Sequence, residues 1–237
     1  RDRSPSRGLG DVYKRQVKPI TGTWINLAYK DVRNRYTNPQ SFDNTDPELW
    51  KAKVRELSAM GIEYLVFMEV ANEGKAYYPS QLMPWWYDKD KQSPVEAILD
   101  EAARYDMKVF MSTGWAKDQD DNLQDPAIKQ RQLQIMEELA VFYKNHKAFY
   151  GWYLPVEDCL CPIFAEHAVQ SVNALTKKAR ALTPDKKTLI SPYGIGLSDF
   201  DNPEYEKQLA KLKVDIIAYQ DEVGLSLIHI SEPTRRT

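Results

Sequence analysis

Apolar runs alternate along the chain with longer amphipathic segments, and the alternation extends from residue 22 to residue 219. The apolar runs are rich in branched and aromatic residues, which favour strands. Four of the amphipathic segments begin with Asp-Pro, Ser-Pro or Asn-Pro, and a capping side chain followed by Pro is a typical helix start. The pattern predicts strands at 22–29, 62–70, 107–113, 150–158, 188–193 and 215–219. It predicts helices at 47–60, 94–105, 126–145 and 162–182, and a further helix that begins at 203.

Strict alternation of strands and helices requires a parallel sheet, because each helix carries the chain back to the start of the next strand. Each predicted unit spans about 35 residues, which is near the unit length of a (β/α)8 TIM barrel. The alternative is a doubly wound sheet, which usually binds its ligand at a Gly-rich first turn. No G-x-G-x-x-G follows the first predicted strand. We therefore predict an α/β fold, an incomplete (β/α)8 TIM barrel with about six of the eight units present.

The two ends of the chain carry an inverted repeat at the level of DNA. Residues 6–16 read SRGLGDVYKRQ and residues 225–235 read LSLIHISEPTR. These two segments can be encoded by DNA strings that are reverse complements, which is typical of a translated sequencing adapter. Such segments are excluded from fold reasoning. We expect residues 1–16 and 225–237 to derive from an adapter and residues 17–224 to form the partial barrel domain; the alternative is a natural basic arm and tail.

Charge and composition exclude several classes of function. The whole chain has a formal net charge of −2, and the two excluded ends hold more basic than acidic residues, so the domain itself is more acidic. An acidic domain argues against a nucleic-acid partner, and no run approaches the roughly 20 apolar residues of a membrane span. Cys159 and Cys161 lack the spacing of a zinc or redox motif, and only His146 and His167 lie within the domain. We therefore expect no metal site and no cofactor.

Acidic residues follow several predicted strands. In a parallel barrel the carboxyl ends of the strands meet at one rim, where ligands bind. Glu157 ends the most apolar run, and the cost of desolvating a carboxylate there calls for a reason. Two carboxylates across one cleft cleave glycosidic bonds, since one protonates the leaving oxygen and the other acts as nucleophile or base. The candidate catalytic residues are Glu157, Glu222, Asp221 and Glu69.

The roles of these carboxylates follow from their surroundings in the sequence. We expect Glu157 to be the general acid, because desolvation beside Trp152 and Tyr153 would raise its pKa. Either Glu222 or Asp221 would supply the second carboxylate, and Glu69 would support the pair. For each of these residues the alternative is an ordinary loop charge or helix-cap partner.

The loop after the second predicted strand holds five aromatic residues within eleven positions, 77–87. Sugar rings stack their C–H faces on such side chains, and aromatic residues with a polar group tolerate a wet rim. The alternatives are a lid packed over the barrel or a partner surface. With residues from the other strand ends, the candidate substrate-binding residues are Trp24, Asn26, Tyr78, Trp85, Trp86, Trp115, Asp158, Tyr193 and Gln220.

Four segments carry a resemblance to a known family. They read T-G-T-W-I-N from residue 21, G-W-Y-L-P-V-E-D from 151, I-S-P-Y-G from 190 and D-I-I-A-Y-Q-D-E-V-G from 215. Residues 17–224 resemble the bacterial family catalogued as domain of unknown function 4434, a glycoside-hydrolase-like TIM barrel. The resemblance implies a protein exported by polysaccharide-degrading bacteria, so we expect a periplasmic or secreted location.

The chain is also similar to retaining barrel glycosidases, in which an Asn-Glu pair ends the fourth strand and a Glu ends the seventh. Glu157 matches the acid position, whereas Val156 stands where those enzymes have Asn. The resemblance implies a hydrolase of O-glycosyl bonds that acts on an oligosaccharide or polysaccharide. One alternative is a noncatalytic carbohydrate-binding or scaffold barrel. Another is a metal-dependent barrel hydrolase, which the absence of paired histidines in the sequence disfavours.

Overall fold

A six-stranded parallel sheet organises the molecule. The computed structural model describes residues 20–28, 30, 35, 37–39, 41–112, 114, 124–157 and 160–220. The sheet has the order β1-β2-β5-β6-β7-β8, and every neighbouring pair is parallel. Its strands are β1 (Gly22–Ile25), β2 (Tyr64–Phe67), β5 (Lys108–Ser112), β6 (Phe149–Tyr153), β7 (Lys187–Ile190) and β8 (Ile216–Ile217). The predicted alternation is confirmed, although each strand is shorter than its apolar run because the last residues of the run leave the ladder.

In the described ranges, five α-helices connect these strands. They are α1 (Pro47–Ala59), α2 (Pro94–Arg104), α3 (Pro126–Tyr143), α4 (Glu166–Leu182) and α5 (Pro203–Lys211). At four of the helix starts a side chain accepts a hydrogen bond from a backbone amide of the first turn, and Pro follows it. These capping residues are Asp46, Ser93, Asp125 and Asn202. The four Asx-Pro and Ser-Pro starts predicted from the sequence are therefore confirmed.

The start of α4 differs from the prediction. The helix begins at Glu166 rather than at Pro162, and its N-cap residue makes no side-chain capping bond. Phe164 is buried and stacks on Tyr205 of α5, with ring centroids 6.0 Å apart. The segment before α4 is thus used for packing between two helices, a long-range contact that the local sequence pattern does not reveal.

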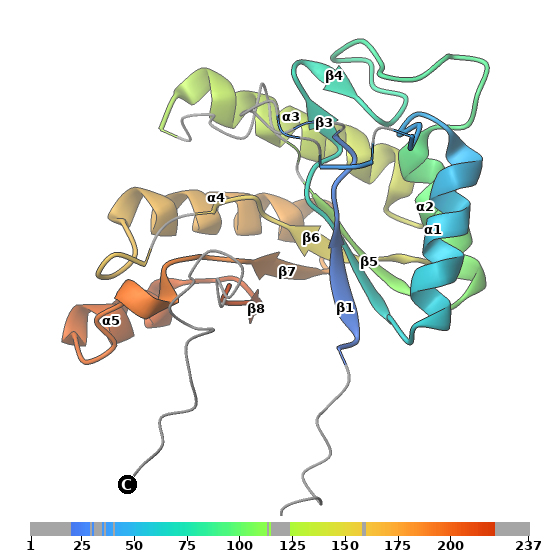
Figure 1. Ribbon diagram of the computed structural model, residues 1–237. Helices are drawn as coiled ribbons and strands as arrows, with labels where there is room; N and C mark the ends of the chain where they lie inside the picture. The colour runs from blue at the N-terminus through green and yellow to red at the C-terminus, as the bar shows by residue number, and fades with distance from the viewer. Residues whose placement is uncertain are drawn as a thin grey trace, which may run out of the picture.

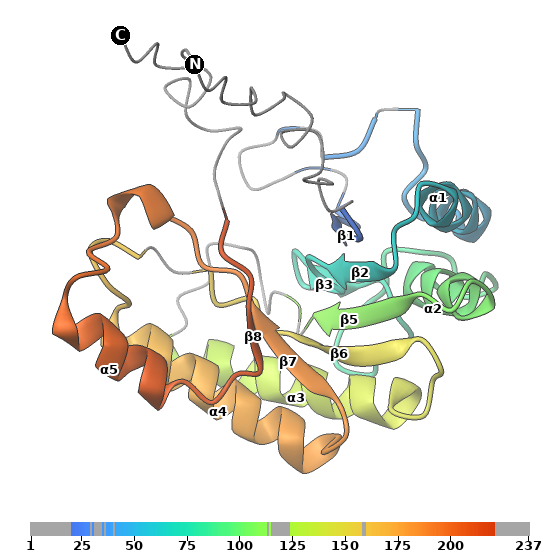
Figure 2. The same cartoon turned by 90° about the horizontal axis from the view of Figure 1, so that it is seen from below.

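The helices lie around the outer side of the curved sheet, as the two views show (Figures 1 and 2). Side chains on that side, such as Leu65, Met111 and Trp152, form one large core with Ile98 of α2 and Leu139 of α3. This arrangement follows from the strand period of two, which sends alternate side chains to opposite faces. The architecture is a half-barrel whose outer face carries most of the packing.

The inner face of the half-barrel has its own smaller apolar cluster. Val66, Phe110, Tyr153 and Leu189, from four different strands, form its buried part. Because these strands are parallel, their carboxyl ends lie along one edge. One end of the inner cluster therefore lies at the edge of the sheet where the loops after the strands begin.

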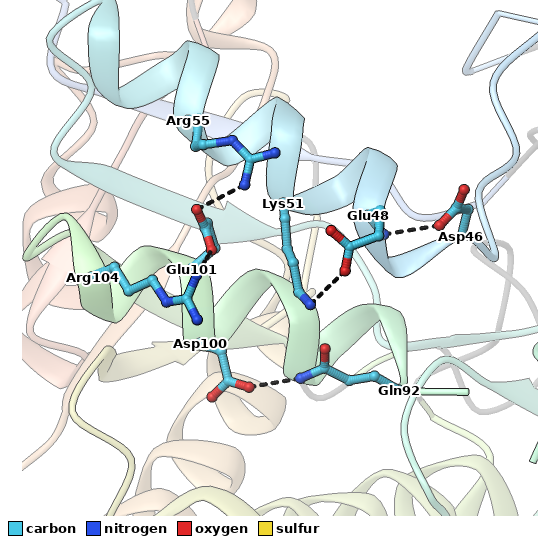
Figure 3. A network of polar contacts seen from close by, with 8 residues as sticks. All are labelled: Asp46, Glu48, Lys51, Arg55, Gln92, Asp100, Glu101 and Arg104. Atoms are coloured by element: carbon cyan, nitrogen blue, oxygen red, sulfur yellow. Dashed lines mark hydrogen bonds and ion pairs between the residues drawn. The ribbon is translucent and has the colours of Figure 1, made fainter. Parts of the chain in front are cut away.

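A buried carboxylate links α1 to α2 (Figure 3). Glu101 of α2 is only 2% exposed, and its two oxygens accept hydrogen bonds from Arg55 of α1 at 3.0 Å and Arg104 of its own helix at 3.1 Å. A buried charge is tolerated only when it is paired in this way. The pair fixes the two helices that cover β2 and β5, and it lies on the outer side of the sheet.

Gly151 of β6 is a position where only hydrogen fits. A Cβ atom there would lie 2.6 Å from the carbonyl oxygen of Lys187 and 2.7 Å from the ring of Phe110. Both neighbours belong to the adjoining strands, so neither can move without disturbing the sheet. Gly151→Ala is expected to lower the free energy of unfolding by about 1–3 kcal/mol, measured by urea denaturation.

The matched control for that substitution is Gly196→Ala. A Cβ atom at this position meets nothing within 4 Å. The control is expected to change stability by less than about 0.5 kcal/mol. Equal effects of the two substitutions would contradict the close approach of β6 to β7.

Candidate active site

Glu157 lies just beyond the carboxyl end of β6, where it is partly buried. Its Oε1 accepts a hydrogen bond of 2.6 Å from the hydroxyl of Tyr153, the last residue of the strand. Burial raises the pKa of Glu157, and the Tyr153 hydrogen bond opposes that rise. Within the part of the chain that the structure describes, the side chain is thus an acid of raised pKa held by one neutral donor, which suits a group that gives and takes a proton.

Tyr153 connects Glu157 to Trp24 of β1. The two rings meet edge to face, with centroids 6.2 Å apart and planes at 84°. Burial and the charge of Glu157 raise the pKa of Tyr153, whereas the nearby indole N–H of Trp24 lowers it. The Tyr153 hydroxyl donates to Glu157. Trp24 keeps 39% of its surface exposed beside this hydrogen-bonded pair.

Glu69, which follows β2, is almost fully buried, with 2% of its surface exposed. Its Oε1 accepts two hydrogen bonds of 2.6 Å from the backbone amides of Leu27 and Ala28, the residues after β1. Desolvation raises the pKa of Glu69 to about 7; the two amides lower it, and the charge of Glu157 raises it further. The carboxylate therefore fastens the end of β1 to the end of β2, within electrostatic range of Glu157.

Trp152 does not contribute to the environment of Glu157. It is fully buried on the outer side of the sheet, where its indole N–H donates to the hydroxyl of Thr183 at 2.8 Å. The expectation that Trp152 desolvates Glu157 was therefore wrong, since neighbouring residues on a strand face opposite sides. Tyr153 is the strand residue that meets the carboxylate.

Tyr78 does not offer a surface to a ligand. It is fully buried, and its hydroxyl donates to Glu138 of α3 at 2.9 Å. The same carboxylate accepts from the Ser80 hydroxyl at 2.7 Å and from the Gln81 amide at 2.5 Å. The prediction that Tyr78 stacks on a sugar fails, because this tyrosine instead anchors the loop of residues 77–87, the aromatic loop, to α3.

Trp85 and Trp86 are partly buried in the aromatic loop, and each stacks on a tyrosine. Trp85 stacks on Tyr87 with centroids 5.3 Å apart, and Trp86 stacks on Tyr77 with centroids 6.0 Å apart. A lysine also lies over each indole, Lys89 at 5.5 Å and Lys75 at 4.4 Å from the ring centroids. These contacts agree with the alternative of a packed lid, because the indole faces are already in contact with other side chains.

The remaining candidates divide into those at the edge and those outside the described residues. Asn26 is partly buried, and its Oδ1 accepts from the Ala28 amide at 2.9 Å. Tyr193 is 39% exposed after β7, and the Gln220 amide donates to the carbonyl of Ser191 at 2.8 Å. Four further candidates lie outside the described residues, namely Trp115, Asp158, Asp221 and Glu222.

The structure brings together Trp24, Glu69 and Glu157 from three different strands. It adds Tyr153, which the sequence offered only as an apolar neighbour; its position four residues before Glu157, at the end of the same strand, was the available signal. Within the described ranges, no group of three His, Cys, Asp or Glu side chains is placed to hold a metal ion. No helix of the described chain is long and apolar enough to cross a bilayer.

Comparison with known proteins supports the family and the fold. A family model described as "Domain of unknown function (DUF4434)" matches residues 20–235. No curated protein matches the chain significantly. A solved "putative alpha-L-fucosidase" from Bacteroides thetaiotaomicron aligns with a TM-score of 0.63 and 20% identity, over 86% of this chain and 66% of that one. An endo-1,4-beta-mannanase from Rhizomucor miehei aligns with a TM-score of 0.51 and 9% identity, over 74% and 63%.

These likenesses show the fold. The chain spans slightly less than two thirds of the length of either solved structure. The predicted architecture is confirmed, since the parallel half-barrel matches TIM barrels of glycoside hydrolases.

The hydrogen bond from Tyr153 predicts a measurable change at Glu157. This bond lowers the pKa of Glu157, so Tyr153→Phe is expected to raise that pKa further. The carboxyl carbon of Glu157, followed by NMR over a pH series, would report the change. Tyr150→Phe on the same strand is the control, and an unchanged pKa in Tyr153→Phe would contradict the proposed contact.

The raised pKa of Glu69 predicts a loss of stability with rising pH. The folded-state pKa of about 7 exceeds the unfolded value of 4.5, so the folded state binds more protons between these pH values. Stability contributed by the neutral carboxyl is full below pH 4.5 and is lost as pH rises through 7. From pH 4.5 to pH 8, the original chain should therefore lose on the order of 3 kcal/mol of its free energy of unfolding relative to the Glu69→Gln variant.

The Glu69→Gln variant keeps an oxygen that can accept from the Leu27 and Ala28 amides, so the comparison isolates the charge. Urea denaturation at several pH values is the measurement. A difference between the two proteins that stays constant across this pH range would show that Glu69 titrates normally.

Proposed function

The chain belongs to the DUF4434 family, and from that premise we propose that it is a glycoside hydrolase domain in which Glu157 is the general acid. The observation that carries this proposal is the placement of Glu157 at the carboxyl end of β6, partly buried and hydrogen-bonded by Tyr153. Active sites of (β/α)8 barrels lie at that end of the strands. The fold similarity to glycoside hydrolases supports the same assignment.

General acid catalysis explains why Glu157 should be partly buried. Cleavage of a glycosidic bond needs a proton on the leaving oxygen as the bond breaks. Desolvation, which raises the pKa of Glu157, keeps a proton available nearer to neutral pH. The Tyr153 hydroxyl orients the carboxyl group and stabilises its ionised form after the proton has left.

Glu69 acts in this proposal through position and charge rather than by touching the substrate. Its carboxylate is almost completely buried and is held by two backbone amides. As in the prediction from the sequence, the second carboxylate of the reaction is therefore assigned to Asp221 or Glu222, which follow the last described strand. Trp24, with its exposed surface next to Tyr153, would stack on a sugar ring beside the reacting bond.

A noncatalytic carbohydrate-binding barrel is the second candidate function. The observation that favours it is the almost complete burial of Glu69. Burial keeps this carboxyl group from a substrate, even though its pKa responds to the charge of Glu157. Binding alone would need the aromatic and polar residues of the rim but no second reactive carboxylate.

The test is a screen for reducing-sugar release from a panel of glycans. Because the chain spans less than two thirds of its solved relatives, the assay uses the product of the complete gene. Loss of a general acid is expected to lower the rate by about 10²–10⁴-fold in Glu157→Gln. Glu63→Gln, an exposed glutamate before β2, is the control and should leave the rate unchanged.

Two results would count against the assignment. Equal rates in Glu157→Gln and the original protein would exclude Glu157 as the acid. Glycan binding that survives Glu157→Gln, without release of sugar from any glycan by the original protein, would favour the noncatalytic function.

A further inference from the structure

A cavity of about 570 Å³ lies between the segment after β1 and the aromatic loop. Its volume falls within the range of sites that bind small molecules. It is lined by three aromatic residues, Phe42, Tyr77 and Trp86, and by Asn44 and Asn72. Tyr77 is fully buried, whereas Phe42 and Trp86 are partly exposed. Apolar walls with a few convergent polar groups are the composition expected of a ligand site.

Hydrogen bonds fix the walls of this cavity. The Asn44 amide donates to the carbonyl of Leu27 at 2.8 Å, and the Trp86 indole donates to the carbonyl of Asn72 at 3.1 Å. Asn72 belongs to the hairpin of β3 (Ala71–Asn72) and β4 (Lys75–Ala76). The cavity therefore exists before a ligand arrives, which lowers the entropic cost of binding.

The cavity shares its boundary with Glu69. Ala28 lines the cavity and donates its amide to Glu69. Tyr77 also lines it; burial raises the pKa of that tyrosine, and the charge of Glu69 adds to the rise. Ala28 follows β1 and Glu157 follows β6, so the cavity and Glu157 lie on the side of the sheet where the parallel strands end.

The charged groups of the cavity favour an uncharged ligand. Asp43 and Glu73 bring two carboxylates to the lining, and Lys30 brings one ammonium group. Hydrogen bonds from the side chain and amide of Thr45 hold the pKa of Asp43 below its usual value, so this carboxylate stays ionised at neutral pH. An acidic sugar would meet repulsion from the two carboxylates, whereas hydroxyl groups can donate to them.

We infer that this cavity is a subsite that binds an uncharged saccharide unit, apart from the bond that Glu157 would cleave. The inference rests on the proposed function, because it assigns the same glycan a second point of attachment. Hydroxyl groups would donate to Asp43 and Glu73, and the C–H groups of the sugar would pack against the exposed parts of Phe42 and Trp86.

Ser41 offers a way to block the cavity without disturbing its walls, since it is exposed and lies on the lining. Calorimetry with neutral gluco-, xylo-, manno- and fuco-oligosaccharides, and with a uronic-acid oligomer, would measure binding to the product of the complete gene. Ser41→Trp is expected to weaken binding of a neutral oligosaccharide at least about tenfold, whereas Ser41→Ala should stay within about twofold. Glu73→Gln provides a second variant with little change in shape, and it should also weaken binding.

Binding and hydrolysis are separable in this design. Affinities are compared within the Glu157→Gln background, where loss of the proposed acid keeps the oligosaccharide intact, so failure of the catalytic proposal leaves the subsite testable. The inference is overturned if no neutral oligosaccharide binds, if the uronic-acid oligomer binds more tightly, or if Ser41→Trp and Glu73→Gln both bind with unchanged affinity.

Discussion

The buried carboxylate of Glu69 is the contact on which the candidate site depends. By accepting the amides of Leu27 and Ala28 it joins the ends of the first two strands, where a parallel sheet makes no further ladder bonds. That junction positions Trp24 on β1 relative to Tyr153 on β6. It also borders the cavity that lies between the segment after β1 and the aromatic loop. A carboxyl group used in this way is costly to desolvate, and its pKa of about 7 reflects that cost.

The carboxyl groups of the structure differ in how fully hydrogen-bond donors satisfy them. Glu101 and Glu138 are carboxylates on the outer helices, and each is satisfied by fixed donors: Glu101 by two arginines and Glu138 by the aromatic loop. Glu157 differs because it lies at the strand ends, partly exposed, and accepts from one donor among the described residues. A carboxyl group that is desolvated without being saturated by hydrogen bonds keeps the capacity to exchange a proton with a ligand at the rim.

The elements that the sequence predicted well are those encoded by neighbouring residues. Two adjacent residues specify each of four helix starts, namely Asp46-Pro47, Ser93-Pro94, Asp125-Pro126 and Asn202-Pro203. The apolar runs specify the strands. The start of α4 was missed because Phe164 is held by Tyr205, a partner far along the chain. Tyr78 was misassigned for the same reason, since its partner Glu138 lies 60 residues away. Trp152 and Tyr153 could have been distinguished, because strand alternation sends only one of them toward Glu157.

As a general acid, Glu157 must meet a glycosidic oxygen at the rim of the barrel. A crystal structure of the Glu157→Gln variant of the complete gene product, with a bound oligosaccharide, would test it most directly. We expect a glycosidic oxygen within about 2.6–3.2 Å of the side chain at position 157, with a sugar ring against Trp24. An oligosaccharide bound only elsewhere on the molecule, with water at position 157, would contradict it.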